Sequence, residues 1–154
     1  MKDITVPETS DIQALKQKPV TLDVPVTRGK TCITEVSIRK PTTGDLRGAR
    51  LQPLLETDVD ALIRVLPRVT VPTLTPEEVL NLDPADLYQL AAILTLFCAE
   101  LGPVRFPDRL TVDDLTADIA AVFHWTPADT APMSLGDLLA WRHKALIRSG
   151  AVDE

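Results

Sequence analysis

The chain has 154 residues, of which 45% are hydrophobic and 25% charged, and its formal net charge is −6. A chain of this length buries enough surface to fold without disulfides or metal ions. The negative charge argues against contacts with nucleic-acid phosphates, and the sequence has neither a polybasic membrane anchor nor an apolar run long enough to cross a bilayer. Because the first residues hold no apolar signal core, these observations predict a protein of the cytoplasm.

Alternating polarity begins after a polar stretch at residues 1–18, where we expect a flexible leader, disordered or extended except for a helical turn around residues 12–16. Apolar residues then follow a period of two over residues 20–26. A second alternating run places four residues on one face: Cys32, Thr34, Val36 and Ile38. Because a short turn with Gly29 joins the two runs, they predict a β-hairpin, and Pro25 predicts that its first strand lies at a sheet edge.

Helix start signals follow residue 41, and most of them join a capping side chain to an acidic residue or a proline in the first turn. They occur at Thr42 or Thr43, Thr57, Thr75, Asp83, Thr111, Thr126 and Ser134. The first predicts a short helix over residues 46–51, and the second predicts a helix that Pro67 ends. The helix that begins at Pro84 is nearly apolar on all sides, which is typical of a helix in a core or against a partner.

Residues 103–110 contain two prolines and predict a linker. Beyond it, residues 111–150 predict a small helical module. We therefore expect an α+β fold that is mainly α, in which an N-terminal β-hairpin packs on a helical domain over residues 19–102 and the C-terminal module follows.

Residues suited to catalysis or metal binding are sparse. The two histidines, His124 and His143, fall on different predicted elements, and two separated cysteines do not complete a zinc site. The carboxylate pairs Asp58/Asp60 and Asp113/Asp114 lie in the first turns of helices, where the helix dipole explains them. The sequence favours a protein that is not an enzyme and has no cofactor or metal.

The order of the motifs resembles the tail assembly chaperones of contractile-tailed phages, in the Mu-like and E-type families. The resemblance covers roughly residues 18–102. Its most specific segments are Pro41-Thr42-Thr43-Gly44-Asp45-Leu46-Arg47 and Leu82-Asp83-Pro84-Ala85-Asp86-Leu87.

The C-terminal module is similar to a second family, the short E-prime-type tail protein. The residues that carry this similarity are Ala117-Asp118-Ile119-Ala120-Ala121-Val122-Phe123-His124-Trp125, Met133-Ser134-Leu135 and Leu139-Ala140-Trp141-Arg142. In many such phages the module is made only when ribosomes change frame, so a chain with both modules resembles the long, frameshift-type fusion product. Frameshifting and plain gene fusion stay open as origins.

The resemblance implies a chaperone in the host cytoplasm that binds the tape measure protein, promotes polymerisation of the tail tube protein and is absent from the mature virion. The first module would bind the tape measure and the second would recruit tube protein, and self-association is left open. The alternatives are a minor structural tail protein and a small helical adaptor for another phage protein.

Large apolar and aromatic side chains are the expected contacts with these partners, because they supply most binding energy at interfaces. They are Leu87, Leu94, Phe97, Phe123, Trp125, Leu138 and Trp141, together with Arg142. An equally weighted interpretation is that Trp125 and Trp141 pack on each other to hold the small module together.

Overall fold

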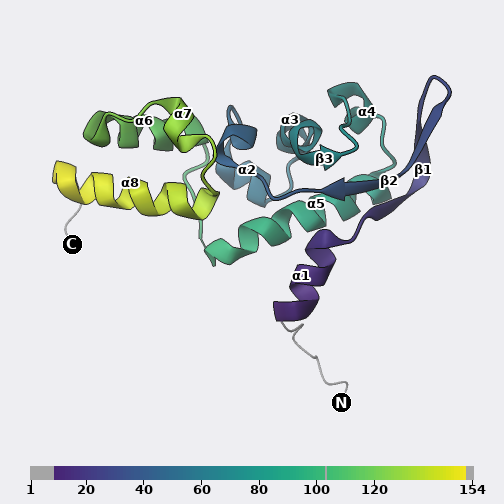
Figure 1. The fold of residues 1–154 in the computed structure, drawn as a ribbon, viewed down its shortest axis with the longest axis horizontal. Helices are drawn as coiled ribbons and strands as arrows, with labels where there is room; N and C mark the ends of the chain where they lie inside the picture. Colours follow the sequence, from purple (N-terminus) through teal and green to yellow (C-terminus); the bar gives the residue numbers. More distant parts are fainter. Residues whose placement is uncertain (1–8, 103, 152–154) are drawn as a thin grey trace, which may run out of the picture.

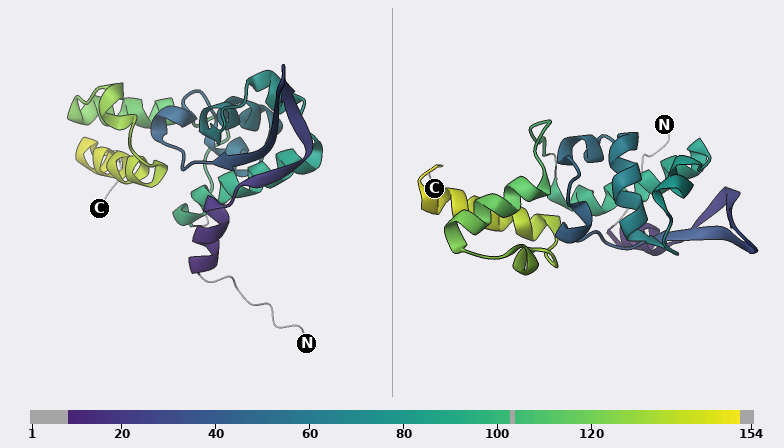
Figure 2. Two further views of the ribbon diagram at one scale, coloured as in Figure 1. Left: turned by 45° about the vertical axis from the view of Figure 1, so that its right-hand side comes forward. Right: turned by 90° about the horizontal axis from the view of Figure 1, so that it is seen from above.

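The computed structural model describes residues 9–102 and 104–151 and confirms a mainly α, α+β fold. A three-stranded antiparallel sheet in the order β1-β2-β3 packs on helices (Figure 1). The hairpin of β1 and β2 lies at one end of the elongated molecule, and the two longest C-terminal helices lie at the other (Figure 2).

The hairpin comprises β1 (Val20–Arg28) and β2 (Thr31–Ile38), and β1 lies at the sheet edge as Pro25 predicts. The pairing changes register between Thr21 and Val26. Such an irregularity moves side chains to the other face of the sheet. The predicted face of β2 is therefore wrong in its first half, where Ile33 is buried while Cys32 and Thr34 are exposed.

The carboxylate of Asp86 fixes the irregular part of β1. It is fully buried and accepts hydrogen bonds from the backbone N–H groups of Asp23 (2.8 Å) and Val24 (3.1 Å). Two strand donors that the irregular pairing leaves unpaired thus find an acceptor in a side chain of α5 (Pro84–Cys98).

Helix α3 (Val59–Val69) differs from its prediction at both ends. Its N-cap is Asp58, whose carboxylate accepts from the Ala61 N–H, and not Thr57, which has a positive φ of 59°. Pro67 was predicted to end the helix but lies inside it. The helix continues past Pro67 because its final turn is closed by the hydrogen bond from the Thr70 N–H to the Leu66 carbonyl. The chain continues directly into β3 (Thr70–Val71), which pairs with the end of β2.

The short helix predicted over residues 46–51 is instead two elements. A 3₁₀ turn, η1 (Thr43–Leu46), follows the capping box of Thr42 and Asp45, and α2 (Leu51–Leu55) begins after the turn at Gly48. The φ of +76° at Gly48 is accessible to glycine and interrupts the helical course.

The other start signals are confirmed. Capping boxes begin α4 (Pro76–Leu80), α6 (Val112–Phe123) and α7 (Pro127–Thr130), and Asp83 and Ser134 accept hydrogen bonds from the first turns of α5 and α8 (Leu135–Ser149). A second 3₁₀ turn, η2 (Ala99–Leu101), follows α5 and ends at Gly102.

The described part of the predicted leader is helical and not extended, because residues 9–17 form α1 (Thr9–Gln17), which packs against α5. Lys16 of α1 is buried and its ammonium group lies 5.3 Å from the centroid of the Phe97 ring, so the helix gains a tertiary contact that local composition does not show. Residues 1–8 lie outside the described residues.

The described part of the predicted linker is packed onto the first domain. Phe106 is buried, and its backbone N–H donates to the Gln52 side chain at 2.8 Å. The Leu51 N–H donates to the Leu110 carbonyl at 3.0 Å, and Arg50 pairs with Thr111 in a short antiparallel bridge. The C-terminal module therefore begins on a chain segment that is already fixed.

Candidate partner-binding surfaces

The C-terminal module brings three of the predicted partner-binding residues into one aromatic cluster. Phe123 ends α6, Trp125 follows the left-handed turn at His124, and Trp141 lies in the middle of α8. The ring centroids are 5.3 Å apart for Phe123 and Trp125, 4.8 Å for Trp125 and Trp141, and 5.6 Å for Phe123 and Trp141. All three side chains are half-buried, so the cluster both packs the module and presents ring surface to solvent.

Cationic side chains surround the aromatic cluster. The ammonium group of Lys144 lies 4.3 Å from the Trp141 centroid, and the guanidinium of Arg148 lies 5.5 Å from that of Phe123. Arg142, also predicted as a partner contact, donates from Nε to the Asp118 carboxylate at 2.8 Å and so joins α8 to α6. Aromatic rings with arginine and lysine are the side chains expected at a binding hot spot.

The remaining predicted residues do not join this cluster. Leu94 and Leu138 are fully buried, so they stabilise the two domains and do not reach the surface. Leu87 and Phe97 are half-buried on α5.

An apolar groove between α1 and α5 escaped the sequence analysis. Its volume is about 450 Å³, and Ala92, Ile93 and Leu96 contribute to its lining. Leu15 is 48% exposed and Tyr88 is 73% exposed at this groove. One feature of the sequence could have indicated this groove: residues 87–99 contain no charged side chain. Since one side of a helix must face away from the core, an apolar helix of this kind leaves an apolar surface open.

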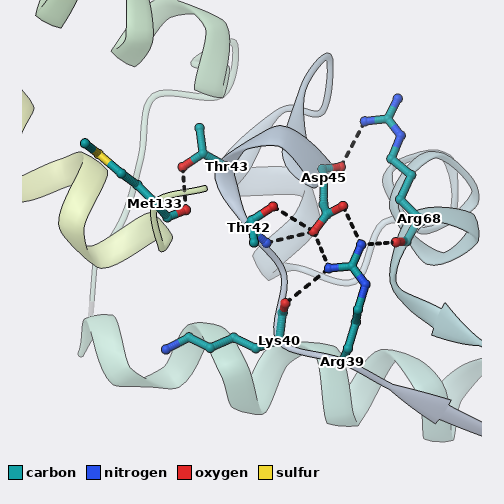
Figure 3. A network of polar contacts seen from close by, with 7 residues as sticks. All are labelled: Arg39, Lys40, Thr42, Thr43, Asp45, Arg68 and Met133. Atoms are coloured by element: carbon teal, nitrogen blue, oxygen red, sulfur yellow. Dashed lines mark hydrogen bonds and ion pairs between the residues drawn. The ribbon is translucent and has the colours of Figure 1, made fainter. Parts of the chain in front are cut away.

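The C-terminal module docks on η1 through a network of polar contacts (Figure 3). The backbone N–H and the hydroxyl of Thr43 both donate to the Met133 carbonyl, at 2.8 and 2.9 Å, and the Gly44 N–H donates to the Ala131 carbonyl at 3.0 Å. Beside this contact, both terminal nitrogens of Arg39 bind the Asp45 carboxylate at 2.7 Å. The junction is therefore built largely from main-chain donors and acceptors.

Asp45 is held ionised within this network. Partial burial disfavours its charge, but the hydrogen bonds from Arg39 and Thr42 outweigh that effect and lower the pKa of the carboxyl below its usual value. The carboxylate thereby stabilises the capping box that begins η1.

Metal-binding side chains do not converge in the described part of the chain. Over residues 9–102 and 104–151 no three His, Cys, Asp or Glu side chains form a metal-binding group. Burial raises the pKa of the Cys98 thiol, which disfavours the reactive thiolate. In the same residues, no helix combines the length and apolar character needed to span a membrane.

Both halves of the chain match known phage proteins. Residues 19–99 match a family described as phage tail assembly chaperone proteins, E, or 41 or 14, and residues 116–152 match a family described as phage P2 GpE. The chain belongs to the phage tail assembly chaperone family, as the sequence motifs predict.

Two relatives come from Escherichia phage P2. Tail assembly protein E' is 50% identical over 140 residues, which cover 90% of this chain and 99% of that protein. Tail assembly protein E is 49% identical over 76 residues, which cover 49% of this chain and 84% of that protein. No solved structure matches the chain. These names support a role in tail assembly and describe assembly factors, not enzymes.

Proposed function

We propose that this protein is a chaperone that binds the tape measure protein, promotes polymerisation of the tail tube around it in the host cytoplasm, and does not remain in the virion. The observation that best supports this function is the apolar groove between α1 and α5. A helix with an apolar stripe fits such a groove, as in other helix-in-groove recognition.

The energetics suit a chaperone. Each large apolar side chain that a bound helix buries contributes about 1.5–3 kcal/mol before ordering costs are subtracted. The exposed ring of Tyr88 and the half-exposed Leu15 gain further burial on the side of this protein. A long helical partner whose apolar stripes would otherwise aggregate is kept dispersed, and the net charge of −6 limits self-association of this chain.

The matches of the two modules to separate families support the existence of a long and a short gene product. The tail assembly chaperone and GpE families match separate segments, and one phage supplies relatives that correspond to about half and to most of this chain. We infer that the first domain binds the tape measure and that the aromatic cluster recruits tube protein. We also infer that translation from one start produces both forms, the longer one after a change of reading frame near the linker. Mass spectrometry of infected cells should find two products that share residues from 1 to about the linker.

Co-purification of this protein with the tape measure protein of the same phage tests the main proposal. Ala92→Asp places a carboxylate in the groove on an exposed helix position and should abolish co-purification without lowering the melting temperature. Ala121→Asp, at an exposed position of α6 outside the groove, is the matched control and should bind as the parent does.

Three results would contradict the proposal. The first is failure of the parent protein to bind a tape measure protein that stays soluble alone, which would favour an adaptor for another phage protein. The second is equal binding by the Ala92→Asp variant, which would remove the groove as the site. The third is recovery of this protein in purified particles, which would make it a minor structural tail protein.

A further inference from the structure

A second groove shares no lining residue with the groove between α1 and α5. It has a volume of about 620 Å³ and lies between the turn at Gly48, the start of α2 and one side of α3. Its apolar lining comes from Pro53, Ala61, Ile63 and Pro67. Three arginines complete the lining: Arg50, Arg64 and Arg68.

The three guanidinium groups differ in how they are paired. Arg68 donates to the carbonyl of Asp45 at 2.9 Å, as Figure 3 shows, and to that of Arg47 at 2.7 Å. Arg50 and Arg64 are exposed, and their side chains make no hydrogen bond, ion pair or ring contact with the described part of the chain. Two arginines that make no direct ion pair with the described residues thus lie beside an apolar surface in a protein whose net charge is −6.

Gly48 helps to place one of these cations. A Cβ atom at this position would lie 3.1 Å from a terminal nitrogen of Arg64, so the guanidinium rests close against the turn. The absence of a side chain there leaves room for the exposed Arg64 side chain at the groove.

Two carboxylates also line the groove, and their positions have local causes. Asp58 caps α3 through the Ala61 N–H at 3.2 Å, and Asp60 lies in the first turn of the same helix, where the dipole favours a negative charge. They disfavour a phosphate backbone, which would bring a row of negative charges past them. A peptide segment that bears only a few carboxylates differs from such a backbone. It can place its carboxylates near the arginines and away from the first turn of α3.

We propose that this groove binds an amphipathic helix of a partner protein that bears glutamate or aspartate on one face. Its carboxylates pair with Arg50 and Arg64, and its apolar side chains cover Ile63, Pro53 and Pro67. Arginine is well suited to such pairing because its planar fork binds a carboxylate through two parallel bonds. This surface is separate from the α1–α5 groove, so the inference does not depend on the proposed function.

Nuclear magnetic resonance of the full chain tests the inference. The probe is a synthetic helical peptide of about 15 residues, long enough for four turns, with leucines on one face and glutamates beside them. A second peptide carries glutamine in place of each glutamate. The glutamate peptide should shift the Nε resonances of Arg50 and Arg64 and the methyl resonances of Ile63. The affinity of the glutamine peptide should be lower than that of the glutamate peptide by a factor of about ten or more.

Variants of the chain complete the experiment. Combining Arg50→Gln with Arg64→Gln should weaken binding of the glutamate peptide about tenfold and leave the melting temperature unchanged, since neither side chain has a partner to lose. Lys30→Gln, at the exposed hairpin turn, also removes a positive charge and should bind as the parent does.

Four results would overturn the inference: no shift at these resonances, equal binding of the two peptides, equal binding by the doubly substituted chain, or stronger shifts at the same residues with a DNA duplex. None of them bears on binding of the tape measure protein at the α1–α5 groove.

Discussion

The buried core of residues 19–102 is aliphatic, whereas the C-terminal module places all of its aromatic side chains in one half-buried cluster. Fully buried leucines such as Leu66 and Leu90 fill the larger domain between the sheet and α5. The module has only the space between α6 and α8 to fill, with a small buried set that includes Ile119 and Leu138. A small core buries too little surface to be stable by itself, so aromatic packing and docking on η1 compensate.

This difference implies an asymmetric dependence between the two regions. The module uses main-chain groups of Thr43 and Gly44 as docking partners, so it requires an intact first domain. The first domain holds its sheet and helices together without help from the aromatic cluster. Substitutions in the larger core should therefore unfold both regions, and substitutions in the cluster should unfold only the module.

The largest effect is expected for Leu90→Ala. Leu90 has no exposed surface, and its truncation should lower the free energy of unfolding by about 2–5 kcal/mol through lost burial and a cavity. Urea unfolding followed by circular dichroism and by tryptophan fluorescence should show both signals shifting together. Leu80→Ala, at a leucine that is 63% exposed, should change stability by less than about 0.5 kcal/mol. A tryptophan signal that stays at the parent's midpoint would show that the module is independent.

Asp86→Ala should destabilise the first domain by about 3 kcal/mol, because it removes two hydrogen bonds that a fully buried carboxyl group accepts from the N–H groups of Asp23 and Val24. Hydrogen exchange at these two amides should accelerate more than exchange in α3. Asp60→Ala also removes a carboxylate, but one with no partner in the described residues, and should have little effect. Similar losses from the two substitutions would refute the role given to Asp86.

Trp141→Ala should cost about 2 kcal/mol in the module alone, since it removes two aromatic contacts from a half-buried site. Near-ultraviolet circular dichroism should lose the signal of the cluster while the urea midpoint of the first domain is kept. Under the proposed function, this variant and Phe123→Ala should recruit tube protein less well and still bind the tape measure protein. His143→Ala, at an exposed position on the same helix, is the control, and global unfolding with loss of both partners would contradict the expectation.

The smallest effect concerns the ion pair of Arg28 and Glu78, which joins the hairpin to α4. The hydrogen bond from Arg28, aided by the Thr75 N–H, lowers the pKa of Glu78 to about 2. A lowered folded-state pKa means that the contact is fully present above the usual value of 4.5 and is lost as pH falls toward 2. Carboxyl resonances of Glu78 should titrate near pH 2, and Arg28→Ala should move that midpoint toward its usual range. A midpoint near 4.5 in the parent would show that the pair does not form.

Much of the fold follows from local chemistry. The capping side chains of Thr75, Thr111 and Thr126 predict where helices begin because each satisfies N–H groups within its own first turn. The alternating runs and Gly29 predict the hairpin for the same reason, since strand pairing across a short turn involves neighbours in sequence. Packing of Trp125 against Trp141 was one of the two interpretations that the sequence offered for these residues, and the two rings are in contact.

The predictions from the sequence fail where residues distant in the chain decide the local structure. The face of β2 changes because Asp86 provides acceptors to the irregular part of β1, a contact between residues more than 60 positions apart. Residues 9–17 are helical because α5 offers Phe97 and a packing surface. The segment expected as a free linker is fixed by Gln52. None of these partners can be recognised from the segment that they alter.

The sequence by itself determined the family, most of the helix starts, the hairpin and the nearly apolar helix α5, because these depend on residue types within one or two turns of each other. Only the tertiary structure decided which leucines are core and which apolar surface is left open, since burial depends on what packs above a side chain. The pairing of charges was decided in the same way: Arg142 meets Asp118 across two helices, while Arg50 and Arg64 meet no carboxylate in the described chain. Charge and hydrophobicity are properties of residues, but exposure is a property of their arrangement.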